Sequence, residues 1–370
     1  MTSRRDFLLQ ALILPTGLLL KPRVIFDQPS LENLHWHRVE EWGVEGKGWT
    51  ATERYYDRLP SKAKNLVREP VWNLSRHTAG LTASFITNSK SIHIRYELLS
   101  DRLDMYHMPA TGVSGVDLYA EDHSGQERWV QVTHPENKVI EAEMVKNLDG
   151  IKRKYTLYLP LYNGVEHLSI GVPEGMELQP VAPRSTKPLV FYGTSILHGA
   201  CASRPGMAFT NILRRRLNVP AINLGFSGNG RMEPEMADLL SELDAQIFIL
   251  DCVPNMSTEM VEERVVPFVR KLHYVRPQAD ILLTEGRTFA NAIFDPGLAE
   301  GHGRSRKALT EAYHTLKPAL QGRLHYLQSI HLIGDDGEGT TDGSHPNDLG
   351  MVRYADAYEP VLRNILGKYK

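Results

Sequence analysis

The stretch Leu189-Val-Phe-Tyr-Gly-Thr-Ser-Ile196 joins an apolar run to a short polar loop that carries a serine. A continuous apolar run of this length is typical of a strand buried on both faces of a sheet. Similar runs occur at 221–224, 246–250, 281–284 and 324–327, and helical patterns lie near 207–217, 234–243, 259–276, 304–320 and 349–366. This alternation predicts an α/β domain over residues 187–370, built on a doubly wound parallel sheet of about five strands.

The residues before this domain have a different pattern. The segments 81–87 and 91–97 alternate apolar and polar positions, and further short strands are predicted at 115–120, 129–132, 155–159 and 167–170. Short strands at this spacing predict a β-sandwich or jelly-roll domain over residues 35–182. A Pro-rich linker at 180–188 follows it. The five tryptophans of the chain all lie before this linker, and we expect them to pack in the core rather than form a sugar-stacking platform.

Composition narrows the possible partners. A net charge of −2 gives no electrostatic basis for binding nucleic acid or an anionic membrane surface. Two cysteines are too few for a disulfide scaffold. We find no Walker loop, no zinc-spaced Cys/His cluster and no His-Glu-x-x-His motif, so neither a metal nor an organic cofactor is predicted. The oligomeric state does not follow from the sequence.

Residues 1–30 have the features of an export signal. Arg4 and Arg5, followed by Phe7-Leu8, resemble the twin-arginine motif, and an apolar stretch extends to Leu20. No small-x-small cleavage site follows Leu20, so cleavage and retention as a membrane tether both remain open. We expect a bacterial protein that is periplasmic, cell-surface or secreted.

Four loops after predicted strands carry polar groups, at the sheet edge where doubly wound folds place their sites. They contain Ser195, Gly228, Asn255, and the pair Asp342 and His345. A serine hydroxyl becomes nucleophilic when a histidine takes its proton, and that histidine needs an acceptor to fix its tautomer. The spacing Asp342-Gly-Ser-His345 lets one loop supply both the base and its acceptor. These residues predict a hydrolytic Ser-His-Asp triad.

Other residues compete for these roles. His198 is the rival base, although from its loop we expect it to line the substrate pocket. Asp335 and Asp336 are rival acids, but no histidine lies beside them in sequence. Asn255 could cap a helix instead of serving the site, and Gly225 and Gly230 are expected only to permit tight turns. Each of these signals is weak when it is taken alone.

The four blocks together, in this order, resemble the SGNH (GDSL-like) hydrolases. The resemblance implies that Ser195 is the nucleophile, His345 the general base and Asp342 its orienting acid. It also implies an oxyanion hole formed by the backbone N–H groups of Ser195 and Gly228 and by the amide of Asn255. Two blocks depart from the family pattern. The first is Gly-Thr-Ser-Ile rather than Gly-Asp-Ser-Leu, and the third is Asp-Cys-Val-Pro-Asn rather than Gly-x-Asn-Asp.

The first half resembles the GxDLY module that precedes such domains, through the run Gly115-Val-Asp-Leu-Tyr119. In this two-domain subfamily we expect the loop 107–112 to reach the catalytic cleft. Three residues are therefore predicted to contact substrate: His107, His198 and Arg204. Cys201 and Cys252 follow strands that neighbour each other in a flavodoxin-like order, so a disulfide is conceivable, although buried free thiols are favoured.

These features favour an exported serine esterase without a cofactor. Its expected substrate is a short-acyl ester, first of all an acetyl group on a carbohydrate. Three alternatives remain open: a glycan-binding protein with an inactive hydrolase-like domain, a lipase or thioesterase, and an acyltransferase that uses the same triad.

Overall fold

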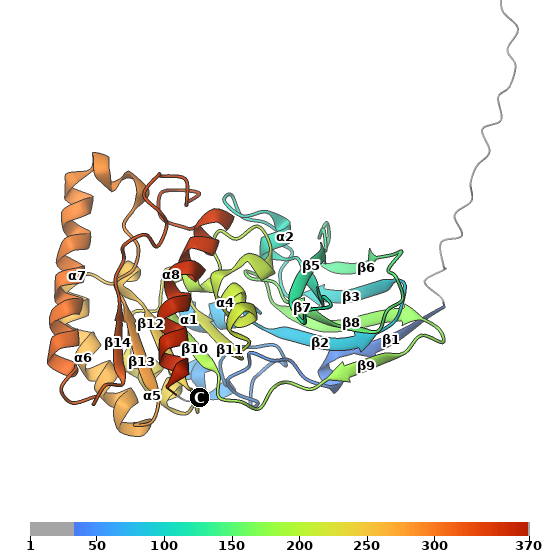
Figure 1. Ribbon diagram of the computed structural model, residues 1–370, viewed down its shortest axis with the longest axis horizontal. Helices are drawn as coiled ribbons and strands as arrows, with labels where there is room; N and C mark the ends of the chain where they lie inside the picture. The colour runs from blue at the N-terminus through green and yellow to red at the C-terminus, as the bar shows by residue number, and fades with distance from the viewer. Residues whose placement is uncertain (1–32, 369–370) are drawn as a thin grey trace, which may run out of the picture.

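The computed structural model describes residues 33–368, so the export signal predicted at 1–30 lies outside the described residues. The chain forms an α/β layer structure beside a β-sandwich (Figure 1). None of the helices at positions 33–368 is long and apolar enough to cross a membrane.

The α/β half is built on five parallel strands in the order β11-β10-β12-β13-β14. The strands are β10 (Leu189–Gly193), β11 (Ala221–Gly225), β12 (Ile247–Asp251), β13 (Asp280–Thr284) and β14 (Leu324–Leu327). One face is covered by α4 (Phe209–Leu217) and α8 (Asp348–Gly367). The other is covered by α5 (Pro234–Ser241), α6 (Thr258–Val275) and α7 (Pro296–Leu316). This order is flavodoxin-like, which confirms the predicted doubly wound fold.

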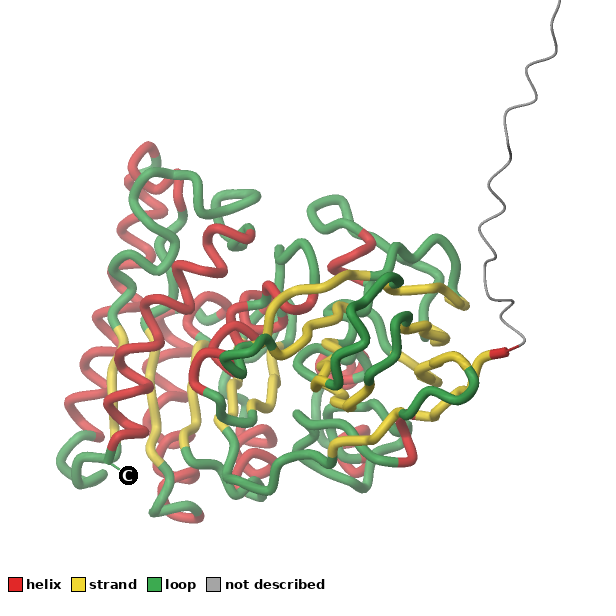
Figure 2. The backbone as a smooth tube through the Cα atoms, turned by 45° about the vertical axis from the view of Figure 1, so that its right-hand side comes forward, coloured by secondary structure: helices red, strands yellow, loops and turns green. Residues whose placement is uncertain are grey.

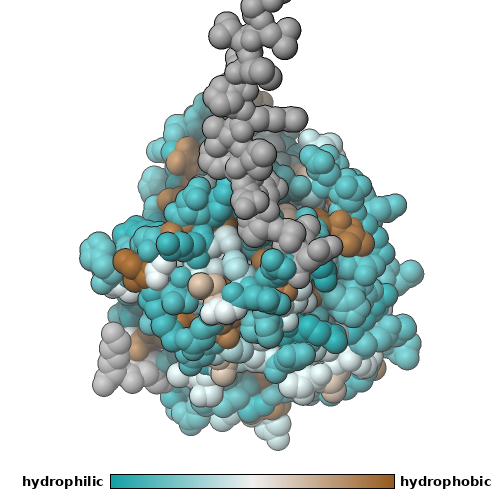
Figure 3. All heavy atoms as spheres, turned by 90° about the vertical axis from the view of Figure 1, so that its right-hand side faces the viewer, coloured by the Kyte–Doolittle hydropathy of each residue, from teal (hydrophilic) through white to brown (hydrophobic). Residues whose placement is uncertain are grey.

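The other half contains two antiparallel sheets with the strand orders β1-β8-β3-β6 and β5-β4-β7-β2-β9 (Figure 2). The strands are β1 (Leu34–Arg38), β2 (Thr82–Thr87), β3 (Ile92–Leu98), β4 (Asp117–Glu121), β5 (Glu127–Val132), β6 (Val139–Val145), β7 (Arg153–Tyr158), β8 (Val165–Pro173) and β9 (Leu178–Val181). Alternate residues of both sheets, such as Phe85, Ile94 and Leu118, share one buried core, which confirms the predicted sandwich. Its outer end is mainly hydrophilic, with scattered apolar residues (Figure 3).

The segment between β1 and β2 departs from the predicted β pattern. It forms the short 3₁₀ helices η2 (Val39–Glu41) and η3 (Ser61–Asn65) and the helix α1 (Glu69–Ser75). Leu59, Val71 and Trp72 of this segment are buried in the same core as Ile222 and Leu240 of the α/β half. The strands predicted over 35–182 therefore do not account for this helical segment. This part of the N-terminal half packs on the parallel sheet and buries its apolar side chains against it.

The tryptophans also differ from expectation. Trp72 is buried, but Trp129 is 48% exposed. Trp36, Trp42 and Trp49 are partly buried. Trp42 and Trp49 nevertheless pack against the hydrophobic cores, so core packing accounts for three of the five, Trp72 included.

Candidate active site

Ser195 stands where a buried strand turns into a short helix. Strand β10 ends at Gly193, and the Thr194 side chain caps the four-residue helix α3 (Ser195–His198) by accepting a hydrogen bond from the Ile196 N–H. The Ser195 Oγ lies 2.9 Å from Nε2 of His345. The Nδ1 of His345 in turn lies 2.7 Å from Oδ2 of Asp342. The structure thus brings the three predicted triad residues into one chain of hydrogen bonds.

The Asp342 carboxylate is held by its own loop. Its Oδ1 accepts the backbone N–H groups of Ser344, at 3.0 Å, and His345, at 2.8 Å. Burial raises the pKa of Asp342, but the hydrogen bonds from the backbone and side chain of His345 outweigh it, so the pKa lies below its usual value. The carboxylate is therefore ionised at neutral pH and can orient the imidazole and stabilise its protonated form.

The two predicted oxyanion loops flank the serine. Strand β10 lies between β11 and β12, so the loops that follow these strands meet on either side of Ser195. The Asn255 Nδ2 donates a 2.7 Å hydrogen bond to the carbonyl of Asn229, which fixes one loop against the other. Gly228 has φ +67°, a left-handed conformation that favours glycine. The hydrogen bond places Asn255 beside Asn229, the residue that follows Gly228.

Gly225 has a role that the sequence did not indicate. A Cβ atom there would lie 2.2 Å from the backbone nitrogen of His198, so glycine is needed for α3 to pack against β11. Its φ is not positive, unlike that of Gly230. The expectation that Gly225 only permits a turn is therefore wrong.

His198 does not line an open pocket, contrary to expectation, and Arg204 is engaged by residues of the sandwich half. His198 is completely buried and stacks on Tyr162 with ring centroids 4.1 Å apart. Arg204 donates to the Asp117 carboxylate at 2.8 Å and to the Tyr119 hydroxyl at 2.6 Å. Arg204 therefore anchors the catalytic half to the Gly-x-Asp-Leu-Tyr strand. The three-dimensional neighbours of both side chains are far away in sequence, so local patterns do not reveal these contacts.

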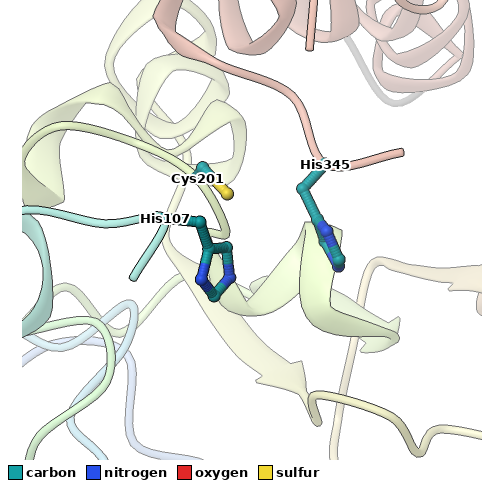
Figure 4. A group of neighbouring side chains, drawn as sticks. All are labelled: His107, Cys201 and His345. Carbon is teal, nitrogen blue, oxygen red and sulfur yellow. The ribbon is translucent and has the colours of Figure 1, made fainter. Parts of the chain in front are cut away.

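His107 does lie at the site. Its ring centroid is 5.7 Å from that of His345, and it comes from the sandwich half (Figure 4). The neighbouring Tyr106 is 89% exposed and lies 4.2 Å from the His107 ring. Cys201 is beside them, and it is a free thiol, as is Cys252. The conceivable disulfide between the two cysteines is therefore not formed.

Arg58 is a buried residue beside the candidate site that the sequence analysis missed. It is 1% exposed and comes from the segment between β1 and β2. Its Nη1 donates to the carbonyls of Asn223 and Gly225, both at 3.0 Å, at the end of β11. Its Nε and Nη2 donate to the carbonyls of His77, at 2.8 Å, and Leu74, at 2.7 Å. Arg58 therefore holds the strand end from which the Gly228 loop begins.

A buried aromatic group lies next to Arg58 beneath the nucleophile. The Tyr162 hydroxyl donates to the Ser195 carbonyl at 3.3 Å. His77 Nδ1 lies 3.3 Å from His198 Nε2. Burial, helped by the charge of Arg58, lowers the pKa of His77 to about 3, so this imidazole is neutral at physiological pH. Isolated histidines and arginines in a loop-rich segment gave no pattern that could have revealed this group.

Arg287 holds the loop that carries Asp342 and His345. It is 7% exposed, and its guanidinium donates to the Ser344 carbonyl at 3.1 Å and to the Ser344 hydroxyl. Ser344 lies between the two triad residues of its loop. A second backbone contact, from Ala290 N–H to the Gly343 carbonyl at 2.8 Å, holds the same loop. The segment after β13 thereby positions the loop that carries the acid and the base.

A small cavity lies beside the Asn255 loop. Its volume is about 190 Å³, and it is bordered by Pro254 and Arg287. Glu285, His302 and Arg306 contribute further polar groups to its lining. The cavity thus adjoins both the predicted oxyanion hole and the support of the triad loop.

Comparison with known proteins agrees with this geometry. Residues 186–363 match the GDSL-like lipase/acylhydrolase family, and residues 34–178 match the GxDLY domain, the N-terminus of SGNH-hydrolase-type esterases. A solved structure of a GDSL-like lipase candidate from Bacteroides ovatus has 33% identity and a TM-score of 0.86, and the alignment covers 90% of this chain and 98% of that one. No curated protein matches this sequence.

Two more distant structures share the two-domain fold. A salicylyl-acyltransferase from a tetracycline biosynthetic pathway has 17% identity and a TM-score of 0.69, with 90% of this chain and 98% of that chain covered. A family two carbohydrate esterase from Cellvibrio japonicus has 13% identity and a TM-score of 0.60, with 91% and 99% covered. The chain belongs to the SGNH (GDSL-like) hydrolase family, in the group whose catalytic domain follows a GxDLY-type β-sandwich.

Proposed function

We propose that the protein is a serine esterase that removes short acyl groups, first of all acetyl, from carbohydrate. The observation that carries this proposal is the chain of hydrogen bonds from Ser195 through His345 to Asp342, with distances of 2.9 and 2.7 Å. In this mechanism His345 takes the Ser195 proton as Oγ attacks the ester carbonyl, and later returns it to the leaving alcohol. Water then releases the acyl group by the reverse sequence of proton transfers.

The oxyanion formed in each step needs donors at a fixed place. We assign this role to the backbone N–H groups of Ser195 and Gly228 and to the amide of Asn255. The hydrogen bond from Asn255 Nδ2 to the Asn229 carbonyl supports the assignment, because it leaves the second N–H of the same amide to face the substrate.

Charge near the site favours a short acyl group. The 190 Å³ cavity beside the Asn255 loop includes Glu285, Arg287 and Arg306 in its lining. Burying a long alkyl chain against such charged groups gains little, because the groups would lose water without gaining partners. An acetyl group avoids that cost.

A sugar is the leaving group that the rim suits. Tyr106 is 89% exposed and lies against His107, so an aromatic face and a polar imidazole flank the catalytic histidine. Apolar faces that alternate with polar edges are what a sugar ring presents, and such a rim complements them. The fold is shared with the family two carbohydrate esterase and with an acetyl xylan esterase from Butyrivibrio proteoclasticus.

The first test compares p-nitrophenyl acetate with butyrate and octanoate esters. We expect turnover to fall as the chain lengthens, and Ser195→Ala to lower kcat by about 10⁴-fold or more. Ser241→Ala removes another buried serine hydroxyl, one that donates to the Asp238 carbonyl, and serves as the matched control. Turnover that rises with chain length would instead support a lipase. Equal turnover in Ser195→Ala and wild type would contradict the assigned nucleophile.

The second test uses acetylated oligosaccharides and measures both free acetate and acetylated acceptor. Release of acetate that depends on Ser195 supports the esterase. Transfer to an acceptor without free acetate would support an acyltransferase. Binding without any reaction, unchanged in Ser195→Ala, would support a glycan-binding protein.

We also propose that residues 1–30 direct export by the twin-arginine route. Replacing Arg4 and Arg5 with lysine should keep the protein in the cytoplasmic fraction of an expressing bacterium. Export of that variant at the wild-type level would refute the proposal.

A further inference from the structure

Three metal-ligating side chains meet next to the catalytic serine. His107, Cys201 and His345 each offer one ligand atom, and the three atoms lie within 4.8 Å of one another (Figure 4). They come from separate parts of the chain: the loop before α2 (Ala110–Val113), the loop after α3 and the loop before α8. We propose that this cluster binds a thiophilic divalent cation, with Zn²⁺ as the reference ion, and that the bound cation reversibly blocks the enzyme.

The separation of the ligand atoms suits such an ion after a small adjustment. Zn–S and Zn–N bonds of about 2.3 and 2.0 Å put neighbouring ligand atoms roughly 3.5 Å apart. The side chains need to close by about 1 Å, which side-chain rotation can supply. One thiolate and two imidazoles form a donor set that selects Zn²⁺ or Cd²⁺ over Mg²⁺ or Ca²⁺.

One ring nitrogen of His107 has no hydrogen-bond partner among residues 33–368. The Nδ1 of His107 is buried and makes no hydrogen bond within the described part of the chain. The imidazole is therefore not tied to a protein acceptor through that nitrogen, and in its neutral form it can give a lone pair to a metal.

The surrounding charges are mixed, with one favourable carboxylate close by. The Asp342 carboxylate acts electrostatically on both His107 and Cys201, and it attracts a cation to the space between them. Arg102 acts on His107 with the opposite sign. A thiol ligates a metal as the thiolate, so the incoming cation must displace the Cys201 thiol proton to solvent. The step is a ligand exchange, and nothing is oxidised or reduced.

Binding would disable catalysis through His345. Its Nε2 faces Ser195 and its Nδ1 faces Asp342, so a cation on either nitrogen replaces one of the two hydrogen bonds of the triad. The inhibition therefore rests on the proposed function of His345, whereas the binding itself does not. The cation acts here as an inhibitor and not as a cofactor.

The first experiment measures hydrolysis of p-nitrophenyl acetate after treatment with a chelator and then titration with Zn²⁺ or Mg²⁺. We expect Zn²⁺ alone to abolish activity and the chelator to restore it. Cys201→Ser should keep basal activity but raise the inhibitory Zn²⁺ concentration about tenfold or more, since loss of a ligand costs at least as much as loss of its supporting partner. Cys252→Ser, at the other buried cysteine, is the matched control and should respond like wild type.

The second experiment detects binding without activity. Cd²⁺ titration of the Ser195→Ala protein should produce the ultraviolet absorption of a cadmium–thiolate bond, at one ion per chain. Cys201→Ser should lose the band, and His107→Gln should weaken it, which provides a second variant if the first does not fold. Absence of the band, or equal Zn²⁺ inhibition of wild type and Cys201→Ser, would overturn the site. A band without inhibition would overturn the proposal that the cation blocks His345, but not the proposal that the cation binds.

Discussion

Replacing Arg58 with methionine tests whether the N-terminal half builds the oxyanion loop. Arg58 makes four hydrogen bonds to backbone carbonyls, of which two are those of Asn223 and Gly225. Hydrogen bonds from a charged donor contribute about 1.5–3 kcal/mol each, or roughly 6–12 kcal/mol together. Burying the charged Arg58 guanidinium away from water costs the folded state several kcal/mol, which offsets part of this contribution. The net loss in Arg58→Met is therefore about 2–4 kcal/mol, because methionine fills most of the volume.

This loss has two measurable consequences. At roughly 2–4 °C per kcal/mol, Tm should fall on the order of 5–10 °C in a thermal melt followed by circular dichroism. The Gly228 loop begins at the strand end that Arg58 holds, so kcat should fall by about 10²-fold, as when one oxyanion donor is lost, while KM changes little. Arg58→Lys restores the charge but not the fork of donors, and should lie between wild type and Arg58→Met.

The control is Arg128→Met, which removes a largely exposed ion pair with Asp122. Exposed pairs contribute about 0–1 kcal/mol, so this variant should melt and react like wild type. If Arg58→Met kept both its Tm and its kcat, the reasoning about Arg58 would be refuted. A fall in Tm with unchanged kcat would show that Arg58 stabilises the fold without shaping the oxyanion loop.

Three further predictions follow from other buried groups. Arg287→Met frees the triad loop at Ser344, so we expect kcat to fall about 10²-fold with KM retained, and Arg287→Lys to recover part of it. Burial raises the pKa of Asp251 from 3.8 to about 6, so the folded state binds that proton more tightly and stability falls as pH rises between these values. Asp251→Asn should therefore raise the free energy of unfolding by about 1–3 kcal/mol near pH 8, which a higher Tm would show. Near pH 4 the substitution should leave Tm unchanged. Arg204 is partly exposed and pairs with the buried Asp117 carboxylate, so Arg204→Met should lower stability by about 1.5–3 kcal/mol while KM for small esters stays unchanged.

Each of these predictions has a result that would contradict it. Wild-type kcat in Arg287→Met would mean that the loop of Asp342 and His345 keeps its conformation without Arg287. A gain in Tm for Asp251→Asn that is equal at both pH values would rule out the buried charge as its source. A raised KM in Arg204→Met, measured on soluble protein, would indicate that Arg204 contacts the substrate.

The fold could be predicted largely from sequence because its strands are short, apolar and regularly spaced. The five parallel strands lie within about one residue of the predicted positions, since continuous runs such as 189–192 have few alternative structures. Strands β1, β6 and β9 were missed. Strand β9 contains Pro180 and β6 has exposed apolar positions, so neither has a clean alternation. The helix α1 was hidden in a loop-rich segment whose burial depends on the other half of the chain.

Some residues of the candidate site could likewise be predicted from sequence, and others could not. Ser195, Asp342 and His345 stand in local patterns, and the structure places them together. His198 was misplaced because its surroundings are set by Tyr162, which lies 36 positions earlier in the chain. Arg58 was missed for a related reason: its acceptors in β11 are 165 and 167 residues away. A single sequence shows which side chains can do chemistry, but not which distant ones will meet.

The position of Arg58 also bears on how such a protein can change through evolution. The carbonyls of Asn223 and Gly225 belong to the hydrolase half, whereas their common donor belongs to the half that precedes it. A recombination event that exchanged either half alone would leave buried acceptors without a donor at the edge of the reaction centre. The two halves therefore depend on each other at this edge, and we expect a chimaera that lacks this arginine to be less stable than the natural pairing.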